Sequence, residues 1–319
     1  MTLSRDYFSK PLLMTPHFSA RPWGGNALRE ILGKNTPTDR GPIGESWELS
    51  DHPDGRSKVD GVTFGELLRT HPREMIGRDR APEKFPILIK YIDAEGDLSV
   101  QVHPDDAWCA RAGHDDRGKS ECWYVMACKP DAKMVYGFRE KVTADQVRAA
   151  VSDGRLTDLM NLAPIREGDF ITIPPGCVHA MLGGTMVCEI QQSSNTTFRL
   201  YDWDRNPPRE LHVEKSLEVS EFDPAKSPKI GHAEDGVLLD NEFFRVRLIS
   251  GKRGEEFELA EDSSDCGAIV NIVEGAGGIA GVSCRRGDTL FVPAAATKPA
   301  RVLAGSGEVK LLVTVSKEI

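Results

Sequence analysis

Polar and apolar residues alternate along many short segments of the chain. Over residues 98–103 every even-numbered position is aliphatic, whereas Ser99, Gln101 and His103 are polar. Successive side chains of a strand point to opposite faces, so these three polar side chains share one face of the predicted strand. Pro104 cannot donate a ladder hydrogen bond and ends it. If the polar face points into a barrel, Gln101 and His103 stand one pleat apart and could hold one ion.

Similar runs predict further strands at residues 44–50, 85–92, 121–128 and 186–192. Two capping-box sequences, beginning at Thr63 and Thr143, predict helices that extend to about Met75 and about Leu162. Residues 16–25 are rich in aromatic and turn-forming residues, and we expect an ordered loop there. With 30 glycines and 20 prolines among many short β-branched runs, the sequence indicates a mainly β protein.

The composition changes near residue 222, after a boundary predicted at Pro207-Pro208, and predicts two domains, residues 1–220 and 221–319. We expect helical insertions at about 63–76 and 141–162 in the first domain. Gly168-Asp169 with Pro174 has an echo in Gly287-Asp288 with Pro293, which places His179 opposite Lys298. The second domain is therefore expected to be a degenerate copy of the first barrel, without its histidine.

Composition restricts the partners of the protein. A chain of 319 residues with 39% hydrophobic and 28% charged residues is typical of a soluble globular protein. The formal charge of −9 argues against nucleic-acid and anionic-membrane partners, which require basic surfaces. Residues 1–14 lack the pattern of a signal peptide, and no apolar run is long enough to span a membrane. Seven scattered cysteines indicate no disulfide framework, so we expect a cytoplasmic protein.

The strongest local motif lies between Gly168 and His179. A Gly-Asp turn, a strand and a Pro-Pro-Gly turn precede the histidine in the pattern GxxxxxPxGxxH. This pattern resembles the second motif of the cupin barrels, jelly-roll-like folds in which that histidine binds a divalent metal. The first cupin motif has HxH where this chain has Gln101-x-His103, and Glu121 follows only after a long insertion.

Taken together, the motifs QVHPDD, GKSECWY, PPGCVHAM and EIQQSSNTTFRLYDWDR, with upstream FPILIKYIDA and GESWELS, resemble the type I phosphomannose isomerases of the short bacterial kind. The similarity covers about residues 10–215. It implies a cytoplasmic enzyme that interconverts mannose 6-phosphate and fructose 6-phosphate by proton transfer through an enediol(ate). It also implies one zinc ion, which the matching residues bind: Gln101, His103, Glu121 and His179.

Two imidazoles, a carboxylate and an amide oxygen form a donor set that suits zinc, and manganese, iron or cobalt could also bind. The resemblance marks Arg199 as catalytic. Lys119 is the second catalytic candidate, because it would share a strand face with Glu121, two residues later, if the strand begins there. It also implies that the substrate is contacted by Lys90, Ser99, Trp23 and Glu45. From the pattern alone, Lys90 could instead extend along an apolar surface or mark a sheet edge.

Alternative functions remain open at this point. A metal-dependent cupin isomerase or epimerase could act on a different sugar, and a dioxygenase would use a 2-His-1-carboxylate iron site in a more apolar pocket. A non-catalytic sugar-binding cupin would be free to lose Lys119 and Arg199, and both are present. These cations favour an anionic small-molecule substrate, a sugar phosphate, for a protein expected to be a monomer or homodimer.

Overall fold

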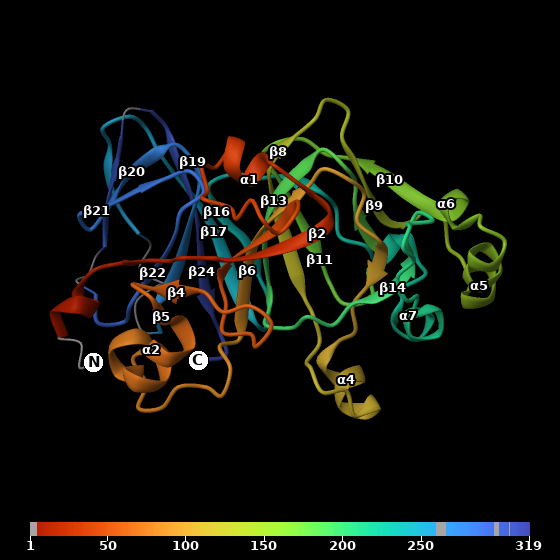
Figure 1. The fold of residues 1–319 in the computed structure, drawn as a ribbon, viewed down its shortest axis with the longest axis horizontal. Helices are drawn as coiled ribbons and strands as arrows, with labels where there is room; N and C mark the ends of the chain where they lie inside the picture. The colour runs from red at the N-terminus through yellow and green to blue at the C-terminus, as the bar shows by residue number, and fades with distance from the viewer. Residues whose placement is uncertain (1–4, 260–265, 297–299, 306) are drawn as a thin grey trace.

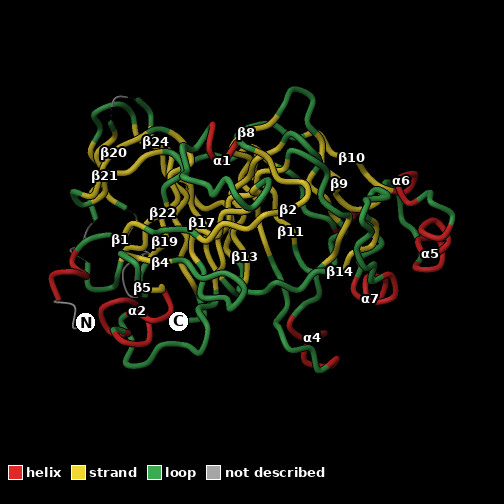
Figure 2. Tube along the Cα trace, in the orientation of Figure 1, coloured by secondary structure: helices red, strands yellow, loops and turns green. Residues whose placement is uncertain are grey.

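The computed structural model describes residues 5–259, 266–296, 300–305 and 307–319. Strands dominate these residues, and the helices lie at the periphery (Figure 2). The prediction of a mainly β protein is therefore confirmed. Figure 1 shows the late strands gathered at one end of the molecule and the earlier sheets at the other, with both termini at the same end as the late strands.

Two facing sheets form the first barrel, in which every neighbouring pair of strands is antiparallel. The seven-stranded sheet has the order β15 (Gly231–His232), β11 (Asp169–Ile173), β8 (Glu121–Cys128), β13 (Thr185–Gln192), β6 (Ile87–Ala94), β3 (Ile43–Leu49) and β2 (His17–Gly25). The five-stranded sheet has the order β10 (Met160–Pro164), β9 (Lys133–Phe138), β12 (His179–Met181), β7 (Val100–Val102) and β14 (Phe198–Tyr201).

The later strands form two more sheets, and a small hairpin joins β4 (Lys58–Val59) to β5 (Val62–Thr63). The six-stranded sheet has the order β1 (Leu12–Leu13), β22 (Thr289–Val292), β19 (Ala268–Glu274), β24 (Val309–Ser316), β17 (Phe244–Gly251) and β16 (Gly236–Asp240). The four-stranded sheet has the order β18 (Glu256–Glu258), β23 (Arg301–Ala304), β20 (Ala276–Ile279) and β21 (Val282–Arg285).

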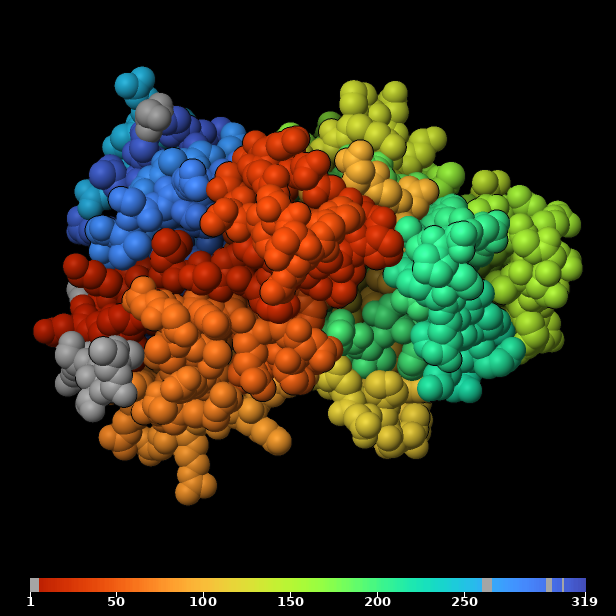
Figure 3. All heavy atoms as spheres, viewed as in Figure 1, coloured from red at the N-terminus to blue at the C-terminus, as the bar shows by residue number. Residues whose placement is uncertain are grey.

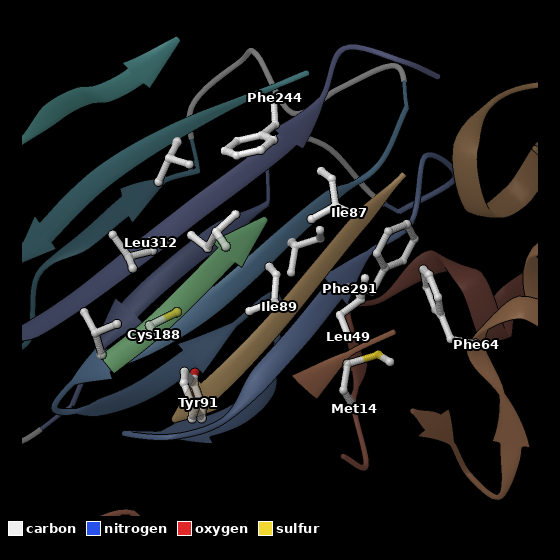
Figure 4. Close-up of a cluster of buried hydrophobic side chains, with 14 of the residues drawn as sticks. Met14, Leu49, Phe64, Ile87, Ile89, Tyr91, Cys188, Phe244, Phe291 and Leu312 are labelled. Carbon is white, nitrogen blue, oxygen red and sulfur yellow. The ribbon is translucent and has the colours of Figure 1, made fainter. Parts of the chain in front are cut away.

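The inner strands β3, β6 and β13 of the seven-stranded sheet are buried on both faces. Along β6, Ile89 and Tyr91 point away from the barrel and join a cluster with Leu312 of β24 (Figure 4). Lys90 and Ile92, between and beyond them, face the barrel interior. The six-stranded sheet thus covers the outer face of the strands that carry the site, which explains why residues 85–92 are a nearly continuous apolar run.

The helices are short, namely α1 (Ala27–Glu30), α2 (Phe64–Thr70), α3 (Pro72–Ile76), α4 (Asp106–Ala112), α5 (Ala144–Ser152), α6 (Leu156–Leu159) and α7 (Val213–Val219), with 3-10 turns η1 (Arg5–Ser9) and η2 (Pro224–Lys226). Helices α5, α6 and α7 pack against the outer face of the five-stranded sheet, whereas α2 and α3 pack into the core shared with the late strands. Thr63 and Thr143 cap α2 and α5 as the sequence indicates, with a complete capping box at Thr143. In the described part of the chain, no helix is both long and apolar enough to cross a membrane.

Residues 16–25 differ from expectation, because they form strand β2 and not a loop. The strand lies at the sheet edge, where Pro22 need not donate to a neighbour, and its pairing with β3 is interrupted between Ala20 and Gly25. An edge position with a broken register accommodates the proline and glycines that made this segment look irregular.

Two edge strands pair with sheets formed mainly by the other part of the chain, on the far side of the predicted boundary at residue 220. Strand β1, near the N-terminus, pairs with β22, and β15, after residue 220, pairs with β11. The division at residues 220 and 221 and the degenerate second barrel stay predictions, and Lys298, the expected counterpart of His179, lies outside the described residues.

The two halves are predicted to depend on each other for stability. Phe291 of β22 is 1% exposed and packs edge-on against Phe64, with ring centroids 5.1 Å apart. We expect Phe291→Ala to lower the free energy of unfolding by about 3–5 kcal/mol, because it removes a buried ring and leaves a cavity. Urea unfolding measures the change. Leu303→Ala, at a position 54% exposed on β23, is the control and should change it by less than about 0.5 kcal/mol. Equal effects of the two substitutions would refute this packing role.

Candidate active site

Facing strands of the two sheets bring three potential metal ligands together. Glu121 begins β8 of the seven-stranded sheet, His179 begins β12 of the five-stranded sheet, and His103 directly follows β7. One ligand atom from each residue lies within 4.8 Å of the others, and all three side chains are buried. Residues that are far apart in the sequence therefore form one compact group inside the barrel.

Distances within the group are short. Nε2 of His179 lies 3.2 Å from Oε1 of Glu121, and Nε2 of His103 lies 3.7 Å from Oε2. Gln101 is the register partner of His179 across β7 and β12, and its amide nitrogen lies 3.3 Å from Nε2 of His179. Rotating the Gln101 side-chain amide by 180° would exchange its nitrogen and oxygen, so that the oxygen would face Nε2 of His179, as a metal ligand requires.

Backbone carbonyls orient both histidines. The Nδ1 atom of His103 lies 2.8 Å from the Thr196 carbonyl oxygen, and Nδ1 of His179 lies 2.9 Å from that of Cys177. A carbonyl accepts only, so each Nδ1 carries the proton and each Nε2 keeps its lone pair toward Glu121. This arrangement of a second hydrogen bond behind each imidazole is typical of metal-ligating histidines.

The turn before His179 also ties the two histidines together. Gly176 has φ of +84°, a conformation that side chains other than glycine rarely adopt, and its N–H donates to the His103 carbonyl oxygen at 2.9 Å. The Pro-Pro-Gly part of the motif therefore sets the approach of β12 to the end of β7.

The protonation states suit a divalent cation. Burial, reinforced by the charge of Lys119, holds the pKa of His103 well below its usual value, so the imidazole is neutral. Burial opposes ionisation of Glu121, but the charge of Lys119 outweighs it and holds the pKa of Glu121 well below the usual value. Neither Glu121 oxygen accepts a well-aligned hydrogen bond. A buried anion beside two imidazole lone pairs fits a bound metal ion.

Lys119 stands between this group and the cavity. Its amine lies 2.7 Å from Oε2 of Glu121 and 3.4 Å from Nε2 of His103. Burial alone would lower the pKa of Lys119, but the charges of Glu121 and Glu189 raise it, so the side chain is a buried ammonium. The sequence prediction that Lys119 lies beside Glu121 matches this geometry.

A cavity of about 440 Å³ opens beside the cluster. Its size is within the range of roughly 300–1,000 Å³ that is usual for small-molecule sites. In Figure 3 the N-terminal segment meets the segment near residue 210 beside a recess on the visible face. Besides Gln101, the cavity is lined by every residue predicted to be catalytic or substrate-binding, namely Trp23, Glu45, Lys90, Ser99, Lys119 and Arg199.

Acidic partners compensate most of the cations at this cavity. Lys90 lies 3.2 Å from Glu189 and over the ring of Trp47, so it neither marks a sheet edge nor reaches solvent. Arg21 lies 2.8 Å from Glu45. Burial opposes ionisation of Glu45, but Lys90 and Arg21 outweigh it and lower its pKa, which leaves a carboxylate at the cavity wall.

Arg199 differs from the other cations. Its guanidinium donates to the Glu210 backbone oxygen at 2.7 Å, its Nε is buried without a partner, and no carboxylate lies within ion-pair distance in the described structure. Burial and the nearby Arg209 lower its pKa. Arg209 lines the same end of the cavity and forms two hydrogen bonds with Asp202. This end therefore carries an excess of positive charge.

Sequence reasoning missed part of the cavity wall. Arg21, Asn195, Thr197 and Arg209 line it, although none belongs to a metal motif. Arg21 was hidden in the segment expected to be a loop, and Arg209 follows the prolines taken as a boundary. Position in a polar, turn-rich segment near a motif was the only available signal.

Comparison with known proteins decides the family. The sequence model described as phosphomannose isomerase type I, catalytic domain, matches residues 12–122. The probable mannose-6-phosphate isomerase GmuF of Bacillus subtilis is 36% identical over 282 residues, which cover 82% of this chain and 88% of the relative. The chain belongs to the type I phosphomannose isomerase family. A mannose-6-phosphate isomerase of Streptococcus mutans is also similar, with 34% identity over 89% of this chain and 93% of that protein.

Solved structures agree with this family assignment. The crystal structure of the mannose 6-phosphate isomerase from Bacillus subtilis has a TM-score of 0.79 and 30% identity, covering 96% of this chain and 99% of that one. A putative mannosephosphate isomerase from Archaeoglobus fulgidus, at 24% identity and a TM-score of 0.77, shares the fold. The expected cupin architecture of a phosphomannose isomerase is confirmed.

The ligand cluster predicts metal content. We expect one divalent ion per chain in the purified protein, and its loss in His179→Ala, because only one imidazole would remain beside the Glu121 carboxylate and the weakly binding Gln101 amide. Elemental analysis after gel filtration measures the stoichiometry. His232→Ala is the control, because His232 contacts Asp169 outside the cluster. Full metal content in His179→Ala, with its folding verified by circular dichroism, would rule out His179 as a ligand.

Proposed function

We propose that the protein interconverts mannose 6-phosphate and fructose 6-phosphate with one bound divalent metal, expected to be zinc. One observation carries the proposal: the His103, Glu121 and His179 cluster adjoins a cavity lined by cations. The similar proteins named as mannose-6-phosphate isomerases support the choice of sugar. With Gln101 as a fourth protein ligand, the set is a mixed nitrogen and oxygen site without thiolate, as zinc accepts.

The distribution of charge suggests how a sugar phosphate is oriented. Arg199 and Arg209 form the end of the cavity where positive charge exceeds negative charge. Arginine presents several N–H donors in a plane, which suits phosphate oxygens. We place the phosphate at Arg209, so that the sugar extends past Arg199, the register partner of Gln101, toward Lys119 and the metal cluster.

Neutral and acidic side chains of the cavity wall are suited to contact the hydroxyl groups of the sugar. The Glu45 carboxylate, ionised and fixed by Trp47 and Arg21, is suited to accept hydrogen bonds from hydroxyl groups. Ser99 and the ring of Trp23 line the same wall. Lys90, held by Glu189, can donate to a sugar or phosphate oxygen, and these residues together would select a polar, hydroxylated substrate.

The reaction moves a proton from C2 to C1 of the open-chain sugar, and no oxidant or reductant is required. Negative charge develops on the sugar oxygens as the proton leaves C2. The Lys119 ammonium and the Arg199 guanidinium are placed to stabilise this charge, and their stabilisation grows as the enediolate forms. A bound divalent metal would supply further Lewis-acid stabilisation.

The structure favours this function over the alternatives. A dioxygenase would use an apolar pocket, whereas this cavity holds Arg21, Lys90, Lys119, Arg199 and Arg209. A non-catalytic sugar-binding cupin has no need for a buried ammonium beside a metal site. Isomerases and epimerases of other sugar phosphates remain the alternative that requires an assay.

A coupled assay tests the proposed activity. With mannose 6-phosphate as substrate, fructose 6-phosphate formation is expected for the purified protein, and a chelator should abolish it until Zn²⁺, Mn²⁺ or Co²⁺ is restored. Glucose 6-phosphate and mannose serve as comparison substrates. Turnover unaffected by exhaustive metal removal, or no turnover of mannose 6-phosphate by the metal-loaded protein, would refute the proposal.

Replacing Arg199 tests its proposed catalytic role. We expect Arg199→Ala to retain the metal and to lower kcat by about 10²–10³-fold, because the guanidinium acts mainly in the transition state. Steady-state kinetics together with elemental analysis measures both properties.

Arg209→Gln provides the contrast, because Arg209 lies at the phosphate end and is held by Asp202. It should mainly raise KM for mannose 6-phosphate. An unchanged kcat with a raised KM in Arg199→Ala would instead make Arg199 a substrate anchor.

A further inference from the structure

The insertion between β7 and β8 ends against a loop of the active site. This loop comprises residues 193–197 and is called the 193–197 loop here. Asp116, near the end of the insertion, accepts a hydrogen bond from the backbone N–H of Asn195 at 2.7 Å and one from the Ser194 hydroxyl at 3.2 Å. The Ser194 hydroxyl has a single proton, and the Arg117 carbonyl oxygen, 2.7 Å away, is the alternative acceptor for it. The insertion therefore holds the start of this loop through the Asp116 carboxylate and the Arg117 carbonyl.

The same loop orients a candidate metal ligand. The Thr196 carbonyl oxygen is the acceptor for Nδ1 of His103, and the Thr196 N–H donates to the Ser194 hydroxyl at 3.2 Å. A continuous path of hydrogen bonds thus runs from Asp116 through Ser194 to Thr196 and on to His103. Asn195 and Thr197 on either side of Thr196 line the substrate cavity.

We propose that Asp116 is a positioning residue for the metal centre, which holds the 193–197 loop so that the Thr196 carbonyl fixes the proton and ring orientation of His103. The proposal rests on the proposed metal-binding function. Asp116 does not line the cavity and lies outside the ligand cluster. It acts on the metal only through the loop, and its carboxylate touches neither metal nor substrate.

The surroundings of Asp116 are built to keep its carboxylate in place. Lys84 lies 3.2 Å from Oδ1, the Arg117 N–H donates to the same oxygen at 3.0 Å, and Nε2 of His52 lies 3.7 Å from Oδ2. Burial opposes ionisation of Asp116, but His52, the Asn195 N–H and Lys84 outweigh it and hold the pKa of Asp116 well below the usual value. One oxygen is thus anchored to the body of the protein, and the other is free to hold the loop.

Removing the carboxylate should loosen the carbonyl behind His103. Loss of a group directly behind a metal ligand typically costs about 10–100-fold in metal affinity. Asp116 acts one step further away, so we expect Asp116→Ala to weaken Co²⁺ and Zn²⁺ binding by about 3–10-fold. Asp116→Asn keeps one acceptor oxygen for the Asn195 N–H and should have a smaller effect in the same direction.

Titration of the metal-free protein tests this expectation. Dissociation constants for Co²⁺ and Zn²⁺ are measured by competition with a chromophoric chelator for the natural chain, Asp116→Ala, Asp116→Asn and the matched control Asp115→Ala. Asp115 is an exposed carboxylate next in sequence, outside the path to the loop. The control should bind both ions as the natural chain does.

Two further measurements separate positioning from general stability. The visible spectrum of the Co²⁺ protein reports ligand geometry, and we expect it to change in Asp116→Ala but not in Asp115→Ala. Urea unfolding of the metal-free proteins shows whether the variants are folded under the titration conditions. If Asp116→Ala does not fold, Asp116→Asn and Ser194→Ala carry the test, because the first removes one of the two carboxylate oxygens and the second removes the hydroxyl between Asp116 and Thr196.

A double-mutant cycle identifies the route. If Asp116 acts through Ser194, the effects of Asp116→Ala and Ser194→Ala on Co²⁺ affinity should be clearly non-additive. Folded Asp116 variants with unchanged affinity and an unchanged Co²⁺ spectrum would overturn the positioning role. If the natural chain itself bound neither ion, the proposed metal-binding function would fail, which is a distinguishable result.

Discussion

The buried carboxylate of Glu121 is the constraint on which the site depends. An isolated anion in the interior of a barrel is costly, and only adjacent cations or a metal ion can compensate it. Lys119 supplies one positive charge at 2.7 Å, and two neutral imidazoles present lone pairs to the same space. The side chains around Glu121 are thus arranged for a further positive charge, and the adjoining cavity brings an anionic substrate to it.

Layered packing makes this arrangement rigid. The seven-stranded sheet is covered on its outer face by the six-stranded sheet, so strands β6, β8 and β13 are fixed from behind (Figure 4). Their inner faces are then free to carry Lys90, Glu121 and Glu189 without losing the apolar contacts that hold the strands. The strands after residue 220 thereby support the site that the earlier residues carry, although they contribute none of the candidate ligands.

Much of the candidate site could be predicted because its signals are local. Alternation over residues 98–103 indicates which side chains share a face, and the spacing from Gly168 to His179 reflects a turn, a strand and a second turn. The structure brings His103, Glu121 and His179 together as expected. Arg21 and Arg209 were missed because they reach the cavity from an irregular edge strand and a connecting segment, whose paths depend on contacts with distant parts of the chain.

By itself, the sequence determined the family, the mainly β class, the candidate ligand residues and the helix starts at Thr63 and Thr143. These follow from residue type, short-range periodicity and capping, which neighbouring residues settle among themselves. Only the tertiary structure decided which sheets face each other, which cations have acidic partners, and how Asp116 reaches the loop behind His103. Such pairings join residues separated by tens of positions, and they arise only when the packed sheets bring those residues within hydrogen-bonding distance.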